Sequence, residues 1–423
     1  SRNSFRFDNC RKVKMRIDSV SVNGATWDVT QMLVLENRMS VRRDYTFTCT
    51  TQALGVTHEV GEASASGNID ELKVQWTLEP GAGITHYDVE WTWVDVEGLD
   101  YYKTGGSFDP DKLFTKNATR VTVISALDEY PVPLIYDGDG YLFYRVRPVQ
   151  QKENGDIVPG AWSTEESVTW YHYEDGHEPG LNWQVSTSYA EDGKRKTVIQ
   201  YFDGTLRGRQ TVTKSISRDP VYANDSVYTI VAESLYDYQG RPTINILPAP
   251  TLNKVIEYAH NFNKFTTDVY PKTLYDLVPL EGEKCATYTP DLDSSSGAAQ
   301  YYSSNNALIA SFIATSHNYI PSAFGYPYTE TRYTDDPTGR VAAQGGVGQE
   351  YQLNKGHETK YFYGSADQEE LDALFGTEVG DASHYFKNMV RDGNGQYSVS
   401  YVDMRGRTIA TALAGPVPDS LDA

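Results

Sequence analysis

Apolar and polar residues alternate strictly along several short runs of the chain. The clearest runs lie at 72–78, 87–93, 121–123 and 142–146. A period of two places the apolar side chains of a strand on one face, and turn-rich gaps between such runs are typical of half-buried antiparallel strands. The pattern therefore predicts a β-sandwich over residues 63–170.

The residues before this sandwich, 1–62, are expected to form a β-rich lead-in. Apolar residues stand in strand-like runs at 15–22, and Asn23-Gly24 is the pair that favours a tight hairpin turn. The small polar residues at 61–67 are typical of a domain boundary.

A recurring segment organises the chain from 171 to 423. It begins with an aromatic residue and an Asp, continues through a turn, and ends with Gly-Arg at the start of a new β-like run. The four copies supply twelve candidate structural repeat residues: Asp203, Gly208, Arg209, Asp237, Gly240, Arg241, Asp335, Gly339, Arg340, Asp403, Gly406 and Arg407. Self-similar units usually indicate stacked elements. We therefore expect a β-sheet region over 171–423.

Each residue type of this segment has a physical role in a hairpin. The aromatic residue packs, the Asp bonds the backbone of its own turn, and the Gly is free to adopt a positive φ. The Arg begins the next strand, where its forked guanidinium can bond the Asp or a carbonyl of a neighbouring turn. These roles are structural and intramolecular.

Two stretches interrupt the β pattern. Residues 365–376 carry a Ser cap, acidic residues in the first turn, apolar residues on one face and a Gly stop, which together predict one short helix. The Ser-, Asp- and Asn-rich run at 291–306 is expected to be a loop. The predicted fold class is thus all-β, with a lead-in, a sandwich and a repeat sheet.

Composition narrows the classes of function. The chain has 423 residues, enough for two or three domains. It contains 32 Tyr and only 5 Met, and Tyr suits β-strands in which the ring packs while the hydroxyl stays in water. Its formal net charge of −20 argues against a nucleic-acid partner, because phosphate binding needs clustered Lys and Arg. Short basic stretches such as 194–196 are expected to be solvated strand edges. No apolar run is long enough to span a membrane.

The three cysteines, Cys10, Cys49 and Cys285, are too few for a disulfide scaffold. A Cys10–Cys49 disulfide outside the cell and three free buried thiols both remain open. The first residues, Ser-Arg-Asn, contain neither Met nor a signal peptide, so we expect a fragment of a longer protein.

Candidate metal and catalytic motifs are incomplete. His357-Glu358 begins like a zinc-protease helix, but Tyr361 stands where the second His is required. The segment 291–295 alternates oxygen ligands as a calcium loop does, yet its Gly comes late and the distal Glu is missing. A structural His and a polar loop are the favoured interpretations. No nucleophile elbow, phosphate loop or dinucleotide motif occurs, so we expect no enzyme, cofactor or metal.

Two resemblances give these elements a context. Tyr144-Arg-Val-Arg-Pro-Val149, followed by Gly160-Ala-Trp-Ser163, resembles a fibronectin type III domain, although Leu142 stands where that family often has a corner Tyr. Residues 181–423 resemble the Rhs/YD-repeat superfamily, above all its very large exported members from Bacteroidota. The segments that carry this likeness are 201–204, 236–242, 356–364, 386–396 and 400–413.

The second resemblance implies a long β-sheet wound into a hollow shell around a toxic or variable C-terminal domain. It implies a secreted or cell-surface protein whose partners are the rest of its own polypeptide, including a C-terminal effector, and the secretion machinery. The self-cleaving members carry a DPxGL-type motif. Here Asp336-Pro-Thr-Gly339-Arg340 has Arg in place of Leu, so no protease residues are transferred.

The sequence therefore favours a non-catalytic structural segment of a β-shell. The alternative is an extracellular adhesin or glycan-binding module that uses the sandwich and Tyr-rich loops. Trp76, Trp91 and Trp93 are expected to fill a core rather than to stack on sugars.

Overall fold

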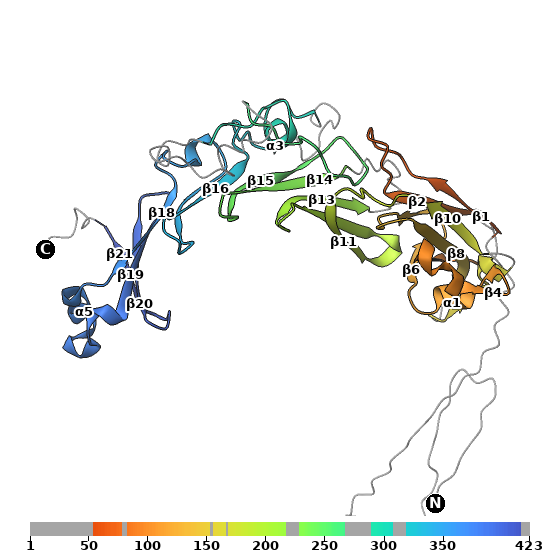
Figure 1. Ribbon diagram of the computed structural model, residues 1–423, viewed down its shortest axis with the longest axis horizontal. Helices are drawn as coiled ribbons and strands as arrows, with labels where there is room; N and C mark the ends of the chain where they lie inside the picture. The colour runs from red at the N-terminus through yellow and green to blue at the C-terminus, as the bar shows by residue number, and fades with distance from the viewer. Residues whose placement is uncertain are drawn as a thin grey trace, which may run out of the picture. The chain divides into compact units, whose positions relative to one another are not determined.

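The computed structural model describes residues 54–77, 83–152, 155–165, 168–216, 228–266, 289–307 and 319–415 (Figure 1). The chain divides into two units, Ser1–Thr48 and Cys49–Ala423, and the first unit lies outside the described residues. Cys10, Cys49 and Cys285, and most of the expected lead-in, also lie outside them. In the described part the structure is predominantly β, which confirms the predicted all-β class.

Two antiparallel sheets form the first described part. One has the order β1 (Leu54–Val60), β2 (Glu71–Thr77), β7 (Glu129–Pro133). The other has the order β10 (Thr169–Tyr173), β8 (Gly140–Gln151), β3 (His86–Asp95), β6 (Thr119–Ile124), and β9 (Ile157–Pro159) pairs with β8. Strand β1 lies inside the stretch expected as a lead-in, and it pairs with β2.

The alternating residues fill the core between these sheets. Leu72, Val74, Trp76 and Trp91 are buried there, and Trp93 packs against the cluster with its ring stacked on Tyr136. The outer face of β3 is also closed, because its carboxylates are paired with arginines of β6 and β8. This second burial explains why β3 is buried on both faces.

The segment after β3 forms a small cover. It contains a 3-10 turn (Val96–Tyr102), the ribbon β4 (Lys103–Thr104) and β5 (Ser107–Phe108), and α1 (Pro110–Phe114). Leu113 and Phe114 of α1 pack with Phe143 in a second cluster. Further 3-10 turns lie at Ser163–Glu165 and Glu191–Gly193.

One eleven-stranded antiparallel sheet follows, and its strands stand in chain order from β11 to β21 (Figure 1). The strands are β11 (Asn182–Tyr189), β12 (Arg195–Phe202), β13 (Gly208–Ile216), β14 (Ile230–Tyr236), β15 (Pro242–Pro250), β16 (Tyr328–Tyr333), β17 (Val341–Gly345), β18 (Thr359–Ser365), β19 (Tyr385–Arg391), β20 (Tyr397–Asp403) and β21 (Thr408–Ala414). Only neighbours in sequence pair, so each connection is a hairpin or an insertion between adjacent strands.

Insertions between strands cover the buried face of this sheet. Segments 255–265 and 289–302 supply Ile256, Phe265 and Leu292 to its clusters. The helix α3 (Gly297–Tyr301) lies in the stretch expected as a loop, so that expectation was wrong for these five residues, while the rest of 291–306 forms turns and irregular structure. Its alanines are buried against the sheet, and this packing stabilises a turn that the polar composition does not indicate.

Helix α5 (Gln368–Phe375) confirms the helix predicted at 365–376. Its cap is Asp367, whose side chain accepts from the Glu369 amide, and not Ser365, which ends β18. Leu371 is the buried residue of its apolar face and packs beside Val399. With α1 and α3, the described residues contain more than the one helix expected. Short 3-10 turns lie at Gln349–Tyr351, Thr377–Val379 and Ala382–His384.

Candidate functional site: repeated turns and the sandwich junction

Three hairpins of the large sheet share one five-residue turn. A fourth hairpin has the same Asp–Arg pair in a longer turn, which the Thr334 N–H closes by donating to the Arg340 carbonyl at 2.8 Å. In the turn after β14, the Asp237 N–H donates to the Arg241 carbonyl at 2.9 Å, and the Gly240 N–H donates to the Asp237 carbonyl at 2.8 Å. One carboxylate oxygen of Asp237 accepts from the Gln239 and Arg241 amides. The other accepts from the Arg241 guanidinium, with a closest approach of 2.7 Å. The Asp therefore holds both the backbone and the Arg of its own turn.

The equivalent ion pairs lie four residues apart in every copy. They are Asp203–Arg207 at 2.7 Å, Asp237–Arg241 at 2.7 Å, Asp336–Arg340 at 2.9 Å and Asp403–Arg407 at 2.7 Å. The pairing of the two strands is irregular beside the turn at each of these hairpins. The Asp–Arg pair and the irregular strand pairing beside it therefore recur together in all four hairpins.

Two residues chosen from the sequence, Arg209 and Asp335, do not form the ion pairs of their turns. Arg207, and not Arg209, pairs with Asp203; Arg209 lies inside β13, where its charge acts on the buried Glu233. Asp336, and not the exposed Asp335, closes the third turn. The reason is the fixed four-residue spacing between the carboxylate and the Arg, which the Gly-Arg dipeptide alone does not reveal.

The fourth position of the turn requires a positive φ. Gly240, Gly339 and Gly406 have φ of 81°, 70° and 78°. In the first turn Leu206 takes this position with φ 62°, and Gly208 has no positive φ. A left-handed backbone is unfavourable for a side chain with a Cβ, so Leu206 is a strained residue in this turn.

A fifth turn has the same backbone but no Arg. The Asp392 carboxylate accepts from the Asn394 and Gln396 amides, and Gly395 has φ 85°. Gln396 replaces the Arg, and its amide donates to carbonyls at Tyr397 and Ala414 instead. The Asp and Gly therefore suffice for the turn, and the Arg has a further role.

That role is contact with a tyrosine of the next strand pair. The guanidinium carbon of Arg207 lies 5.1 Å from the Tyr236 ring centre, that of Arg241 lies 4.3 Å from Tyr333, and that of Arg340 lies 4.6 Å from Tyr363. Such a cation is attracted by the negative face of the ring. Each contact joins a turn to a strand outside its own hairpin.

The same tyrosines bond the backbone between the two hairpins. The hydroxyls of Tyr236, Tyr333 and Tyr363 donate to the carbonyls of Gly208, Pro242 and Val341 at 2.8, 2.9 and 3.0 Å. Each acceptor is the first residue of the strand that follows the turn. We call the repeated set of Asp, Arg and Tyr the Arg–Tyr ladder.

Interactions within the turns lower the pKa of their carboxyls. Burial by itself raises the pKa of Asp203, but hydrogen bonds from Thr205 and Arg207 outweigh it and bring the pKa to about 2. Hydrogen bonds from Thr338 hold the pKa of Asp336 well below its ordinary value. Those from Arg407 lower the pKa of Asp403. These carboxylates are charged at neutral pH and act as fixed acceptors.

A buried ionic cluster joins the sandwich to the start of the large sheet. The Lys214 ammonium on β13 lies 2.8 Å from Asp70 and 3.0 Å from Glu71. The Arg195 guanidinium on β12 pairs with Glu71 and donates to the Pro131 carbonyl. Burial raises the pKa of Asp70 despite the opposing effect of Lys214. Two cations thus face two carboxylates.

Sequence reasoning missed this junction. Arg195 belongs to the basic stretch 194–196, which was expected to be a solvated strand edge, yet its side chain is buried. Arg195 is buried because it pairs with Glu71, which lies 124 residues away in the sequence, and a charge is buried only when it is paired. No pattern in the residues around Arg195 indicates that Glu71 is its partner. Ile135 of the sandwich joins Ile199 and Val212 in the same region.

The link between the sandwich and the sheet is also fixed. The Tyr201 hydroxyl donates to Glu178 at 2.5 Å, and Glu178 accepts from the Tyr258 amide at 3.1 Å. His177 Nε2 lies 3.3 Å from the Tyr201 hydroxyl. Burial and the Glu178 charge raise the pKa of Tyr201. Because these groups hydrogen-bond one another, they fix the segment between the sandwich and the sheet, and their role is structural.

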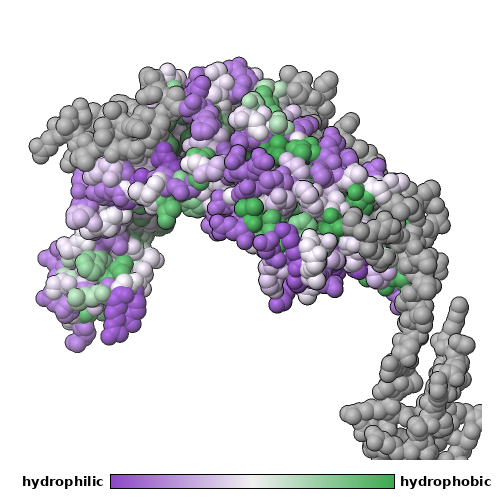
Figure 2. Space-filling view, turned by 45° about the vertical axis from the view of Figure 1, so that its right-hand side comes forward, coloured by the Kyte–Doolittle hydropathy of each residue, from purple (hydrophilic) through white to green (hydrophobic). Residues whose placement is uncertain are grey.

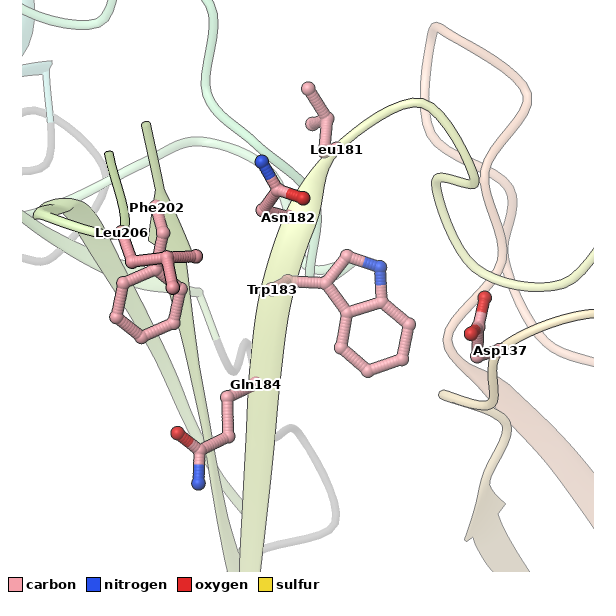
Figure 3. Close-up of a pocket in the computed structure, with 7 residues that line it drawn as sticks. All are labelled: Asp137, Leu181, Asn182, Trp183, Gln184, Phe202 and Leu206. Atoms are coloured by element: carbon pink, nitrogen blue, oxygen red, sulfur yellow. The ribbon is translucent and has the colours of Figure 1, made fainter. Parts of the chain in front are cut away.

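A hollow of about 570 Å³ lies at the start of β11 (Figure 3). Its lining is Asp137, Leu181, Asn182, Trp183, Gln184, Phe202 and Leu206. Figure 3 shows Trp183 directed toward Asp137, while Phe202 and Leu206 lie on the other side of the strand. The lining has one carboxylate, that of Asp137, beside amides and apolar groups. It places no nucleophile next to a base, so these residues form no catalytic arrangement.

The suspected metal motifs form internal contacts. The His357 ring nitrogen lies 3.1 Å from the Gly393 carbonyl, and buried Glu358 pairs with Lys360 at 2.9 Å. Asp293 accepts from the amide and hydroxyl of Ser295. Within the described ranges, no group of three or more His, Cys, Asp or Glu is arranged to hold a metal ion.

Comparisons with protein-family models, curated proteins and solved structures give no match to this chain. In the described part, no helix has the length and apolar character needed to cross a membrane. Figure 2 shows a mostly hydrophilic surface on the face in view, with separate apolar patches. The repeated turns and the junction therefore carry the functional argument.

Proposed function

We propose that this chain is a non-catalytic structural segment of a large secreted or cell-surface Rhs/YD-repeat protein. In this role the large sheet builds part of a β-shell. The mechanism is mechanical: strands bury one face under their own insertions, and successive hairpins are joined by the Arg–Tyr ladder. No cofactor or metal takes part.

The observation that carries this proposal is the chain order of the eleven strands together with the repeated turn. A sheet whose neighbours in space are always neighbours in sequence grows by adding hairpins. The same Asp–Arg pair recurs in four of those hairpins. Both features are expected of a wall made from repeats.

The sandwich supports the fibronectin type III resemblance through its strand order. Three strands (β1, β2, β7) face a sheet of order β10, β8, β3, β6, with a hairpin-rich antiparallel topology. Its ionic cluster with β12 and β13 supports a role as the module that covers the first strands of the wall. Terminal units of stacked folds need such a cover.

The enclosed cargo would be a C-terminal effector of the same polypeptide, as the resemblance implies. The remaining repeats and the secretion machinery are the other proposed partners. A shell keeps such an effector apart from its surroundings until delivery, and it needs continuous pairing because free strand edges associate with other chains.

Electron microscopy of the natural polypeptide that contains this segment tests the proposal. The expected result is a closed β-wall around the C-terminal part, with that part resistant to added protease. An open sheet with a protease-accessible C-terminal part would contradict it. In this 423-residue chain, deletion of residues 365–423 should expose a new sheet edge and cause aggregation, and a soluble monomer would count against a stacked wall.

The adhesin or glycan-binding alternative predicts a different result. Trp170 is partly exposed beside Tyr141 on the sandwich, at a ring distance of 5.2 Å. A glycan array gives this alternative its test. Binding that is lost on Trp170→Ala would favour a binding module over a wall segment.

A further inference from the structure

One edge of β21, the last strand of the large sheet, pairs with no other described strand. Among the described strands, β21 pairs with β20 alone. Its sequence, Thr-Ile-Ala-Thr-Ala-Leu-Ala, contains no charged residue and no Pro, and Leu413 is 78% exposed. Proteins usually protect free edges with Lys, Pro or a covering segment. An uncharged edge of this kind is suited to pairing with another strand.

Within the described residues, the Arg–Tyr ladder ends at the same edge. Arg407 forms its ion pair with Asp403, as the other turn arginines do with their Asp. Its side chain is 70% exposed, whereas those of Arg207, Arg241 and Arg340 are 29%, 20% and 44% exposed. The difference arises because the three earlier arginines lie against tyrosine rings. No ring of the described residues covers Arg407.

The earlier copies define what would complete this position. In each, an antiparallel strand brings a tyrosine near its C-terminal end over the preceding Arg. The hydroxyl then reaches the carbonyl of the first residue after that Arg. At the final turn this first residue is Thr408.

We propose that β21 and Arg407 form a strand-addition site for an antiparallel strand that carries a tyrosine near its C-terminal end. The backbone edge supplies affinity through main-chain hydrogen bonds. Arg407 and the Thr408 carbonyl supply selectivity for the ring and its hydroxyl. This inference rests on the proposed role of the sheet as a wall of stacked hairpins, and it names the chemistry of the strand added next.

A peptide from the chain's own ladder provides the probe. The sequence of residues 230–237, Ile-Val-Ala-Glu-Ser-Leu-Tyr-Asp, contains Tyr236 in its strand context. A fluorescent form of this peptide is titrated with the full 423-residue chain, and binding is followed by anisotropy. A second peptide has Leu in place of Tyr236. The protein variants are Arg407→Ala and, as a matched control, Arg405→Ala, which removes the same charge from the same turn.

We expect the tyrosine peptide to bind the wild-type chain, and the leucine peptide to bind about tenfold more weakly. Arg407→Ala should weaken the tyrosine peptide by a similar factor and leave the leucine peptide unchanged, while Arg405→Ala should change neither. Equal binding of both peptides to the wild-type chain would overturn the proposal, and so would no binding at about 1 mM peptide. Either result leaves the wall itself testable by microscopy.

Discussion

The guanidinium of Arg241 lies 4.3 Å from the centre of the Tyr333 ring, although 91 residues separate Pro242, the next residue, from that tyrosine. The Tyr333 hydroxyl in turn donates to the Pro242 carbonyl at 2.9 Å. One tyrosine therefore contacts both the side chain of a turn and the backbone that leaves it. The long insertion between β15 and β16 leaves this relationship intact because the strands themselves stay adjacent.

Arg241→Leu should destabilise the chain by about 1–3 kcal/mol, because it removes the ring contact and leaves the half-buried Asp237 without its cation. Urea unfolding followed by circular dichroism measures the loss. Tyr333→Phe keeps the ring and removes only the hydroxyl, so it should cost about 0.5–1.5 kcal/mol. Equal stability of Arg241→Leu and wild type would show that the ladder contributes nothing.

Lys214→Ala should be among the most damaging single changes, at about 3–5 kcal/mol, because it leaves Asp70 and Glu71 buried beside each other with one cation fewer. The matched control is Lys254→Ala, since the Lys254–Glu62 pair is exposed and 3.6 Å long. Protease cleavage between the sandwich and the large sheet reports the junction directly. If both variants resist protease like the wild type, the cluster does not hold the two parts together.

Leu206→Gly should stabilise the chain by about 0.5–1 kcal/mol, because glycine adopts positive φ without strain and the 72% exposed Leu206 side chain loses little packing. Gly240→Leu, the reverse change at the equivalent position of the next turn, should destabilise by about 1 kcal/mol or more. Paired thermal unfolding curves test both signs. A stabilising effect of Gly240→Leu would contradict the common turn geometry.

Acid should weaken the turns through their carboxylates. The pKa of Asp203 is lowered in the folded chain to about 2, so its stabilising effect is present above the unfolded pKa of about 3.9 and is lost as the pH falls from about 5 towards 2. Asp203→Asn keeps the backbone acceptor but not the charge. The stability difference between wild type and this variant should therefore shrink as the pH falls over that interval, as measured by urea midpoints. A difference that grows on acidification would reverse the assigned direction.

Much of the local structure was readable from single residues and their spacing. The alternation at 72–78 predicted β2, with Leu72, Val74 and Trp76 in the core. The acidic first turn and the Gly stop located α5. Such features follow from the geometry of one strand or one helix, so neighbouring residues suffice to indicate them.

The partner of a side chain was not readable in the same way. Arg209 follows a Gly as the other turn arginines do, but Arg207 stands at the fourth residue from Asp203, and only the folded turn distinguishes them. Helix α3 was missed because its stability comes from burial under the sheet and not from its own residues.

By itself, the sequence determined the β class, the recurrence of turns that combine an Asp with an Arg, and the position of helix α5, because each depends on contacts within a few residues. The tertiary structure decided which tyrosine covers which arginine, and that Arg195 and Lys214 are buried against Asp70 and Glu71. Those pairings join residues that are between 23 and 144 positions apart. They depend on strand order and on the docking of one part on another, and no local pattern encodes either.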